Sequence, residues 1–214
     1  MTVKAGILLI QFAQRPITGI VKPHLISALG AEGAVQVHLA LMTQTLQTLA
    51  GSGLGNVELW LDKVPALTDQ LPMPFYEMIA ACQNAGIERH AQIGVNQGDR
   101  IYQALAAGLM HHECVLLVDS DCPVLDERYL QEAIELLNEG ETVVFGPAED
   151  GGFVLVGARR VHPQMFANVE WGTPDVLHQT LANCTRLDLA TGCLERLWAV
   201  KQPADVARWQ RLMR

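Results

Sequence analysis

Two acidic residues, Asp119 and Asp121, directly follow the apolar run CVLLV at residues 114–118. In an extended chain, side chains two residues apart point to the same side. Two carboxylates at about 4 Å repel each other by roughly 4 kcal/mol at an effective dielectric constant of 20. A positive partner is therefore expected, and a hard divalent cation such as Mg²⁺ or Mn²⁺ that bridges a diphosphate would serve. The alternative is that one aspartate caps the helix expected from residue 126 or faces water.

A second group lies in the segment 11–25, after the apolar run GILLI at 6–10, and contains Arg15, Gly19 and Lys22. Two cations beside a flexible turn could hold a phosphate, the arginine through several N–H donors and the lysine as a point charge. The alternative is a surface loop with solvated charges.

A third group is the acidic and glycine-rich string at 146–152, in which Glu149 and Asp150 precede Gly151 and Gly152. The string is typical of a tight turn between two strands. It could also bring the backbone close to a ligand, while one acid contacts hydroxyl groups or acts as a base.

Composition limits the function classes. The chain has 214 residues, half of them hydrophobic and 18% charged, which fits one globular domain spanning residues 1–214. The net charge of −8 disfavours binding to nucleic acid or to an anionic membrane. Five cysteines without paired metal-ligand spacing favour a reducing cytoplasm. We expect no stretch with the roughly 18 apolar residues of a spanning helix.

Strands and helices are expected to alternate, which predicts a doubly wound, mostly parallel α/β sheet with helices on both faces. The segment up to Gly30 is expected to be a loop before a helix at 31–49, and Thr173 and Pro174 are expected to start a later helix. In such a sheet, ligands bind beyond the carboxyl ends of the strands. The three groups above follow expected strands, at 6–10, 114–118 and 142–145.

The order of these pieces resembles a bacterial family of nucleotide-diphospho-sugar transferases. That family has the glycosyltransferase-A fold and is similar in fold to the guanylyltransferases that act on molybdopterin and phospholactate precursors. The resemblance extends from about residue 4 to the final expected helix. It is carried by Phe12-Ala13-x-x-Pro16-x-x-Gly19-x-Val21-Lys22, Gly98-Asp99-Arg100, Ser120-Asp121-Cys122-Pro123, Gly146-Pro147-Ala148-Glu149-Asp150-Gly151-Gly152-Phe153 and Trp171-x-Thr173.

The resemblance implies a role for each group. Asp121 would be the carboxylate on the metal or diphosphate side, Arg15 and Lys22 would contact phosphate, and Arg100 would contact the nucleotide. The remaining implied residues would line the sugar or acceptor pocket, and they are Glu149, Asp150, Gly151 and Gly152.

The chain departs from the family pattern at three places. His24 replaces an arginine of the usual Lys-Thr-Arg-Leu string, Lys201 stands in a stretch that is commonly Asp-x-Asp-Thr-Pro, and Asp119 replaces a common glycine. One hypothesis is that Lys201 reaches Asp119 and Asp121 or the diphosphate, so that this protein either binds nucleotide without a metal ion or has lost catalysis. The rival hypothesis is that Asp119 supplies the missing metal ligand.

The function expected from these residues is transfer of a glycosyl group from a nucleoside-diphosphate sugar to a small acceptor in the cytoplasm. One alternative is nucleotidyl transfer from a nucleoside triphosphate to a phosphorylated cofactor precursor, with release of pyrophosphate. The other is a protein that binds nucleotide and has lost catalysis, because a fold alone does not guarantee activity.

Overall fold

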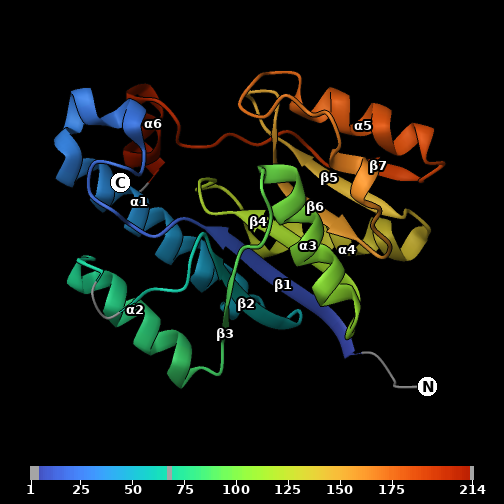
Figure 1. Ribbon diagram of the computed structural model, residues 1–214, viewed down its shortest axis with the longest axis horizontal. Coiled ribbons are helices and arrows are strands. Elements are labelled where there is room, and N and C mark those ends of the chain that lie inside the picture. The colour runs from blue at the N-terminus through green and yellow to red at the C-terminus, as the bar shows by residue number, and fades with distance from the viewer. Residues whose placement is uncertain (1–4, 67–68, 213–214) are drawn as a thin grey trace.

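Seven strands form one sheet in the order β3-β2-β1-β4-β6-β5-β7 (Figure 1). The computed structural model describes residues 5–66 and 69–212. All neighbouring strands run parallel except where β6 pairs with β4 and β5. The mostly parallel α/β sheet expected from the sequence is thus confirmed. The strands are β1 (Ala5–Ala13), β2 (Asn56–Leu61), β3 (Glu88–Ala91), β4 (His112–Asp119), β5 (Val143–Pro147), β6 (Phe153–Ala158) and β7 (Thr191–Cys193).

Helices cover both faces of the sheet. On one face, Leu105 of α3 and Cys184 of α5 pack with Ile10 of β1. On the other face, Leu130 of α4 packs with Leu9, the next residue of β1. The central strands contain continuous apolar runs, residues 6–10 in β1 and 114–118 in β4, because both of their faces are buried. The helices are α1 (Pro23–Ser52), α2 (Met73–Asn84), α3 (Gln97–Leu109), α4 (Glu127–Glu139), α5 (Val176–Arg186) and α6 (Pro203–Leu212), with a short 3₁₀ helix η1 (Pro163–Phe166).

The first helix begins earlier than the sequence indicated. Residues before Gly30 were expected to form a loop, but α1 begins at Pro23 and changes direction at Gly30, whose φ is 72°. Proline is well suited to the first helical turn, and glycine adopts positive φ without a steric penalty. The glycine was therefore a break within a helix and not the end of a loop.

The start of α5 was also predicted wrongly. Thr173 and Pro174 precede the helix, and Asp175 occupies its N-cap position. The Thr173 hydroxyl donates a hydrogen bond to the Glu170 carbonyl at 2.8 Å, so it closes a turn instead of capping the helix.

One helix in the described part of the chain, α1, is long and apolar enough to cross a membrane by length and composition alone. This corrects the expectation that no such stretch exists. Among Asp, Glu, Lys and Arg, the helix contains only Glu32. Its many small and uncharged polar residues leave the mean hydropathy as high as that of a membrane-spanning helix. Several of its side chains, among them Met42 and Leu46, pack against β2 and α2.

Candidate functional site

The ends of β1 and β4 position the acidic pair. The two strands run parallel, and Phe12 pairs with Asp119, the last residue of β4. Beyond it, the buried Ser120 hydroxyl donates to the Phe12 carbonyl at 3.1 Å and accepts a hydrogen bond from Gln11 Nε2 at 2.9 Å. These bonds fix the chain between Asp119 and Asp121, as buried polar groups that satisfy one another do.

A segment far along the chain, the C-terminal strap (residues 197–202), crosses to this edge and leads into α6 (Figure 1). Leu197 forms an isolated bridge with Ala148 at the end of β5, and the Val200 N–H donates to the Asp121 carbonyl at 2.8 Å. Trp198 and Val200 are buried against α1 and α6. The strap therefore delivers Lys201 beside the acidic pair.

Two lysines meet the two aspartates. Lys22 Nζ lies 2.6 Å from Asp121 Oδ1 and donates to the Val200 carbonyl at 2.7 Å. Lys201 Nζ lies 3.2 Å from Asp121 Oδ2 and 3.4 Å from Asp119 Oδ2. The contact expected between Lys201 and the acidic pair is confirmed. The alternative in which one of these aspartates caps α4 is wrong, because Asp126 accepts the capping hydrogen bond from Tyr129 N–H.

The electrostatics of these four residues, the lysine–aspartate quartet, are uneven. Burial opposes the charge on Asp121, but Lys22 and Lys201 outweigh it and lower the pKa of this carboxyl to about 2. At Asp119, desolvation outweighs the attraction of Lys201 and raises the pKa. Asp119 in turn raises the pKa of Lys201. Asp121 is thus the permanently charged acid, and Asp119 is the one that accepts a proton more readily.

A divalent cation does not fit the quartet as it stands. Both carboxylate oxygens of Asp121 contact ammonium groups, one from Lys22 and one from Lys201. The two positive and two negative charges already cancel. A Mg²⁺ or Mn²⁺ ion would have to displace one lysine and then lie beside the other, which carries a charge of the same sign.

The quartet lies in a cavity of about 840 Å³ at the carboxyl ends of β1 and β4. Most of the residues singled out in the sequence meet there. The predicted residues that line the cavity are Lys22, Arg100, Asp119, Asp121, Glu149, Asp150, Gly152 and Lys201.

Comparison with known proteins identifies the family of this chain. A bacterial family described as "Uncharacterized protein conserved in bacteria (DUF2064)" matches residues 45–173. The chain belongs to the DUF2064 family. No curated protein matches the sequence. The bacterial transferase resemblance expected from the motifs is confirmed by the family match and by the structures described next.

Solved structures share the fold of this DUF2064 protein. A protein from Desulfovibrio desulfuricans G20, provisionally named a nucleotide-diphospho-sugar transferase, is 26% identical, with a TM-score of 0.79 over 92% of this chain and 82% of that one. The 4-diphosphocytidyl-2C-methyl-D-erythritol synthase of Anaerococcus prevotii DSM 20548 is 12% identical, with a TM-score of 0.61 over 98% and 97%. Glucosyl-3-phosphoglycerate synthase of Mycobacterium tuberculosis, solved with Mn²⁺ and UDP, is 12% identical, with a TM-score of 0.53 over 97% and 76%.

In this DUF2064 member, the two cations of the first loop separate. The Arg15 guanidinium pairs with Asp62 at 3.1 Å and Asp69 at 2.7 Å, and it does not line the cavity. Gly19 also lies outside the lining and adopts a φ of 81° in the turn between β1 and α1. Only Lys22 of the three predicted loop residues reaches the cavity, because carboxylates that follow β2 take up the arginine.

The two acidic residues of the turn at 149–152 make different contacts. Glu149 accepts two hydrogen bonds from Arg208 of α6, at 2.9 and 3.2 Å, whereas the exposed Asp150 faces the cavity. Gly151 does not line the cavity. Its φ is 87°, and a side chain there would collide with the Pro174 carbonyl. The glycine thus allows the segment that holds Thr173 and Pro174 to form a cavity wall.

The amino end of α3 forms another wall. Asn96 caps this helix by accepting a hydrogen bond from Asp99 N–H at 2.9 Å, and Arg100 Nε donates to the Gly94 carbonyl at 3.3 Å. Gly98 allows close packing, since a Cβ there would lie 2.8 Å from Phe166 Cβ.

Sequence reasoning did not assign several lining residues to the site. Gln92 directly follows β3, so the rule on strand ends could have found it. His38 comes from the middle of α1 and carries no such signal; burial lowers its pKa, and its Nε2 lies 2.9 Å from the Gln14 carbonyl. Further lining residues of this kind include His24, Gln97, Trp171, Thr173, Trp198 and Asp205.

Proposed function

We propose that this DUF2064 protein binds a nucleoside-diphosphate sugar and transfers the glycosyl group to a small acceptor. The observation that carries the proposal is the placement of Lys201, a partly exposed cation, in one cavity with the carboxylate of Asp150. The shared fold with a nucleotide-diphospho-sugar transferase candidate and with a glucosyl transferring enzyme supports the same class.

Lys201 is the group best suited to a diphosphate. An ammonium has three N–H donors, and the contacts with Asp119 and Asp121 use two of them. The third remains for a phosphate oxygen. Lys22 is different, because its side chain is only 6% exposed and its contacts with Asp121 and the Val200 carbonyl anchor the site. In this proposal, Lys201 is the main phosphate contact, in place of Lys22, for which this role was expected from the sequence.

The amino end of α3 supplies further attraction for an anion. Helix amino ends carry partial positive charge and unpaired N–H groups, which stabilise phosphate. Gln97 and Arg100 of the first turn both line the cavity. In this proposal, Arg100 contacts the nucleotide side of the donor.

The reaction breaks the bond between the anomeric carbon and the phosphate oxygen, and the bonding electrons leave with the nucleoside diphosphate. An acceptor hydroxyl forms the new bond to that carbon, and its proton passes to the Asp150 carboxylate. Lys201 stabilises the negative charge that develops on the leaving phosphate. Glu149 serves as a positioning residue, because Arg208 already engages both of its oxygens.

We propose that donor binding needs no divalent cation, since the chain itself places Lys22 and Lys201 on the acidic pair. The test is a thermal-shift screen of UDP, GDP, CDP and their sugars, each with EDTA and with Mn²⁺. A donor that stabilises the protein equally in both conditions supports the proposal. Stabilisation that appears only with Mn²⁺ would overturn the metal-free part and favour Asp119 as a metal ligand.

Activity is tested with the donor that binds best and a panel of small hydroxyl acceptors. Release of nucleoside diphosphate, reduced strongly in Asp150→Asn but little in Glu135→Gln on the far α4 surface, is the expected result. Release of pyrophosphate from a nucleoside triphosphate would show nucleotidyl transfer instead. Binding without turnover of any donor would identify a protein that has lost catalysis.

A further inference from the structure

A second pair of carboxylates lies at the edge of the sheet, on β2 and β3. The register of these parallel strands places Glu58 opposite Glu88 and Trp60 opposite His90. Because side chains alternate along a strand, these four point to one face of the sheet. Trp60 packs in the core beneath α3, so this is the face that α3 covers.

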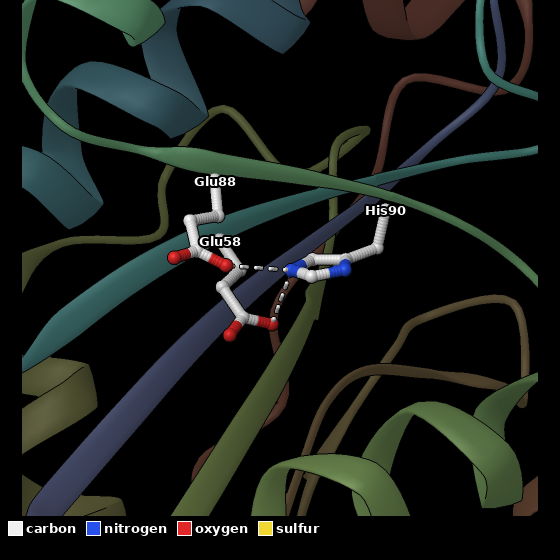
Figure 2. A group of neighbouring side chains, drawn as sticks. All are labelled: Glu58, Glu88 and His90. Atoms are coloured by element: carbon white, nitrogen blue, oxygen red, sulfur yellow. Dashed lines mark ion pairs between the residues drawn. The ribbon is translucent and has the colours of Figure 1, made fainter.

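The two glutamates converge on one nitrogen atom. Figure 2 shows Glu58 and Glu88 directed at the same ring nitrogen of His90, which lies 3.5 Å from Glu58 Oε2 and 3.5 Å from Glu88 Oε2. That nitrogen, Nε2, is shielded from solvent and makes no hydrogen bond. One ligand atom from each residue lies within 4.8 Å of the other two.

We propose that Glu58, Glu88 and His90 form a binding site for a divalent first-row transition metal ion, with Zn²⁺ as its simplest representative. Bonds of about 2.1 Å from Zn²⁺ to nitrogen and oxygen place tetrahedral ligand atoms about 3.4 Å apart. The two distances from His90 Nε2 already have this length. The third ligand pair can adjust, because the Glu88 side chain is 77% exposed.

Trp60 orients two of the three ligands. Its Nε1–H donates to Glu58 Oε2 at 2.7 Å, and its ring packs against the His90 ring with centroids 5.0 Å apart. Hydrogen bonds and packing of this kind hold the ligands of protein metal sites in place.

The charge and the ligand types select the ion. Among the residues that the structure describes, His90 is the only ion-pair partner of these two glutamates. Two carboxylates and a neutral imidazole leave a net charge of −2, which a divalent ion cancels. An imidazole ligand favours Zn²⁺, Ni²⁺ or Co²⁺ over Mg²⁺, which prefers oxygen ligands. The exposed side of the cluster leaves room for water or another small ligand as the fourth donor.

The test is titration of chelator-stripped full-length protein with ZnCl₂ by calorimetry, together with the thermal midpoint. Wild type is expected to bind one Zn²⁺ at this site with an increased midpoint, and His90→Gln to lose about a hundredfold or more in affinity, because a direct ligand is removed. Co²⁺ absorption in the visible range, present in wild type and absent in the variant, reports the ligand set directly.

Two controls separate this site from other metal-binding groups. His111→Gln removes an exposed histidine elsewhere on the surface, and Cys193→Ser removes the exposed thiol; each should leave Zn²⁺ affinity unchanged. Should His90→Gln fold poorly, Glu88→Gln removes a ligand that is mostly exposed. Equal Zn²⁺ affinity in wild type and in both ligand variants would overturn the proposal, as would absence of binding in wild type.

Discussion

Two pairs of carboxylates are neutralised in different ways. Asp119 and Asp121 lie in a cavity where two ammonium groups from distant parts of the chain contact them. Glu58 and Glu88 lie on two adjacent strands at the sheet edge and share one imidazole. The first pair therefore has two ammonium groups of the chain as counter-charges, whereas the second has a single imidazole as its partner.

This contrast shows that acidic residues alone do not indicate where a metal binds. The motif with the stronger sequence signal, Asp119-x-Asp121, is the one that lysines already occupy. The pair without a motif has converging ligand atoms and charge left to neutralise. Whether a metal ion fits beside a pair of carboxylates depends on which cationic side chains the fold already places there.

Replacing Lys201 by Asp should have the largest effect, because it removes the exposed cation and adds a third acid to the pair. Affinity for a nucleoside diphosphate in EDTA is expected to fall about a hundredfold, the equivalent of losing a hydrogen bond between charged groups and gaining repulsion. Mn²⁺ should restore much of the binding. Calorimetry with and without Mn²⁺ measures this, and Lys63→Asp, at an exposed lysine outside the cavity, is the charge-matched control. An unchanged affinity in EDTA would remove Lys201 from the site.

Gly151→Ala tests whether the wall of the cavity that holds the first pair depends on a glycine. The substitution places a side chain at a φ of 87° and against the Pro174 carbonyl, so we expect a loss of about 2.5 kcal/mol in unfolding free energy. Gly152→Ala is the matched control, since its Cβ would meet only Asp150 Oδ1, at 3.4 Å. Urea denaturation of both variants gives the comparison, and equal stabilities would contradict it.

The charge on Asp121 should contribute to stability in a defined pH range. Its pKa is lowered from 3.8 to about 2 in the folded protein, so the contribution is complete above the unfolded value and is lost as pH falls through the folded value. This amounts to about 2 kcal/mol at neutral pH, with about half lost at pH 3. The difference in unfolding free energy between wild type and Asp121→Asn should shrink accordingly between pH 5 and pH 3. A difference that stays constant would show that Lys22 and Lys201 do not stabilise the charged form.

Trp60→Phe should have the smallest effect, on the edge site only. It removes the hydrogen bond to Glu58 and keeps an aromatic ring beside His90. Zn²⁺ affinity is expected to fall about tenfold, with donor binding in the cavity unaffected. If the loss equals that of His90→Gln, the histidine acts through packing and not as a ligand.

The sheet was predictable because strands buried on both faces leave continuous apolar runs, as in CVLLV before Asp119. The acidic pair was predictable because such runs end at the ligand-binding edge. The contact of Lys201 followed from comparing its position with a family pattern.

The fate of Arg15 could not be predicted, because it depends on Asp62 and Asp69, which lie after β2 and become its neighbours only when β1 and β2 pair. The same holds for Glu58 and His90. Each alternates with other side chains along its strand, but no local pattern tells which strands will be neighbours or in what register.

The C-terminal strap has a consequence for how such a pocket can diversify. Its backbone is held by the bridge of Leu197 with Ala148, by the Val200 bond to Asp121 and by the buried ring of Trp198. None of these involves the side chain at position 201. A single substitution at position 201 can therefore reverse the local charge while the backbone keeps its conformation. Closely related proteins could then use either a lysine of their own chain or a bound metal ion beside the acidic pair, with the same fold of the C-terminal strap.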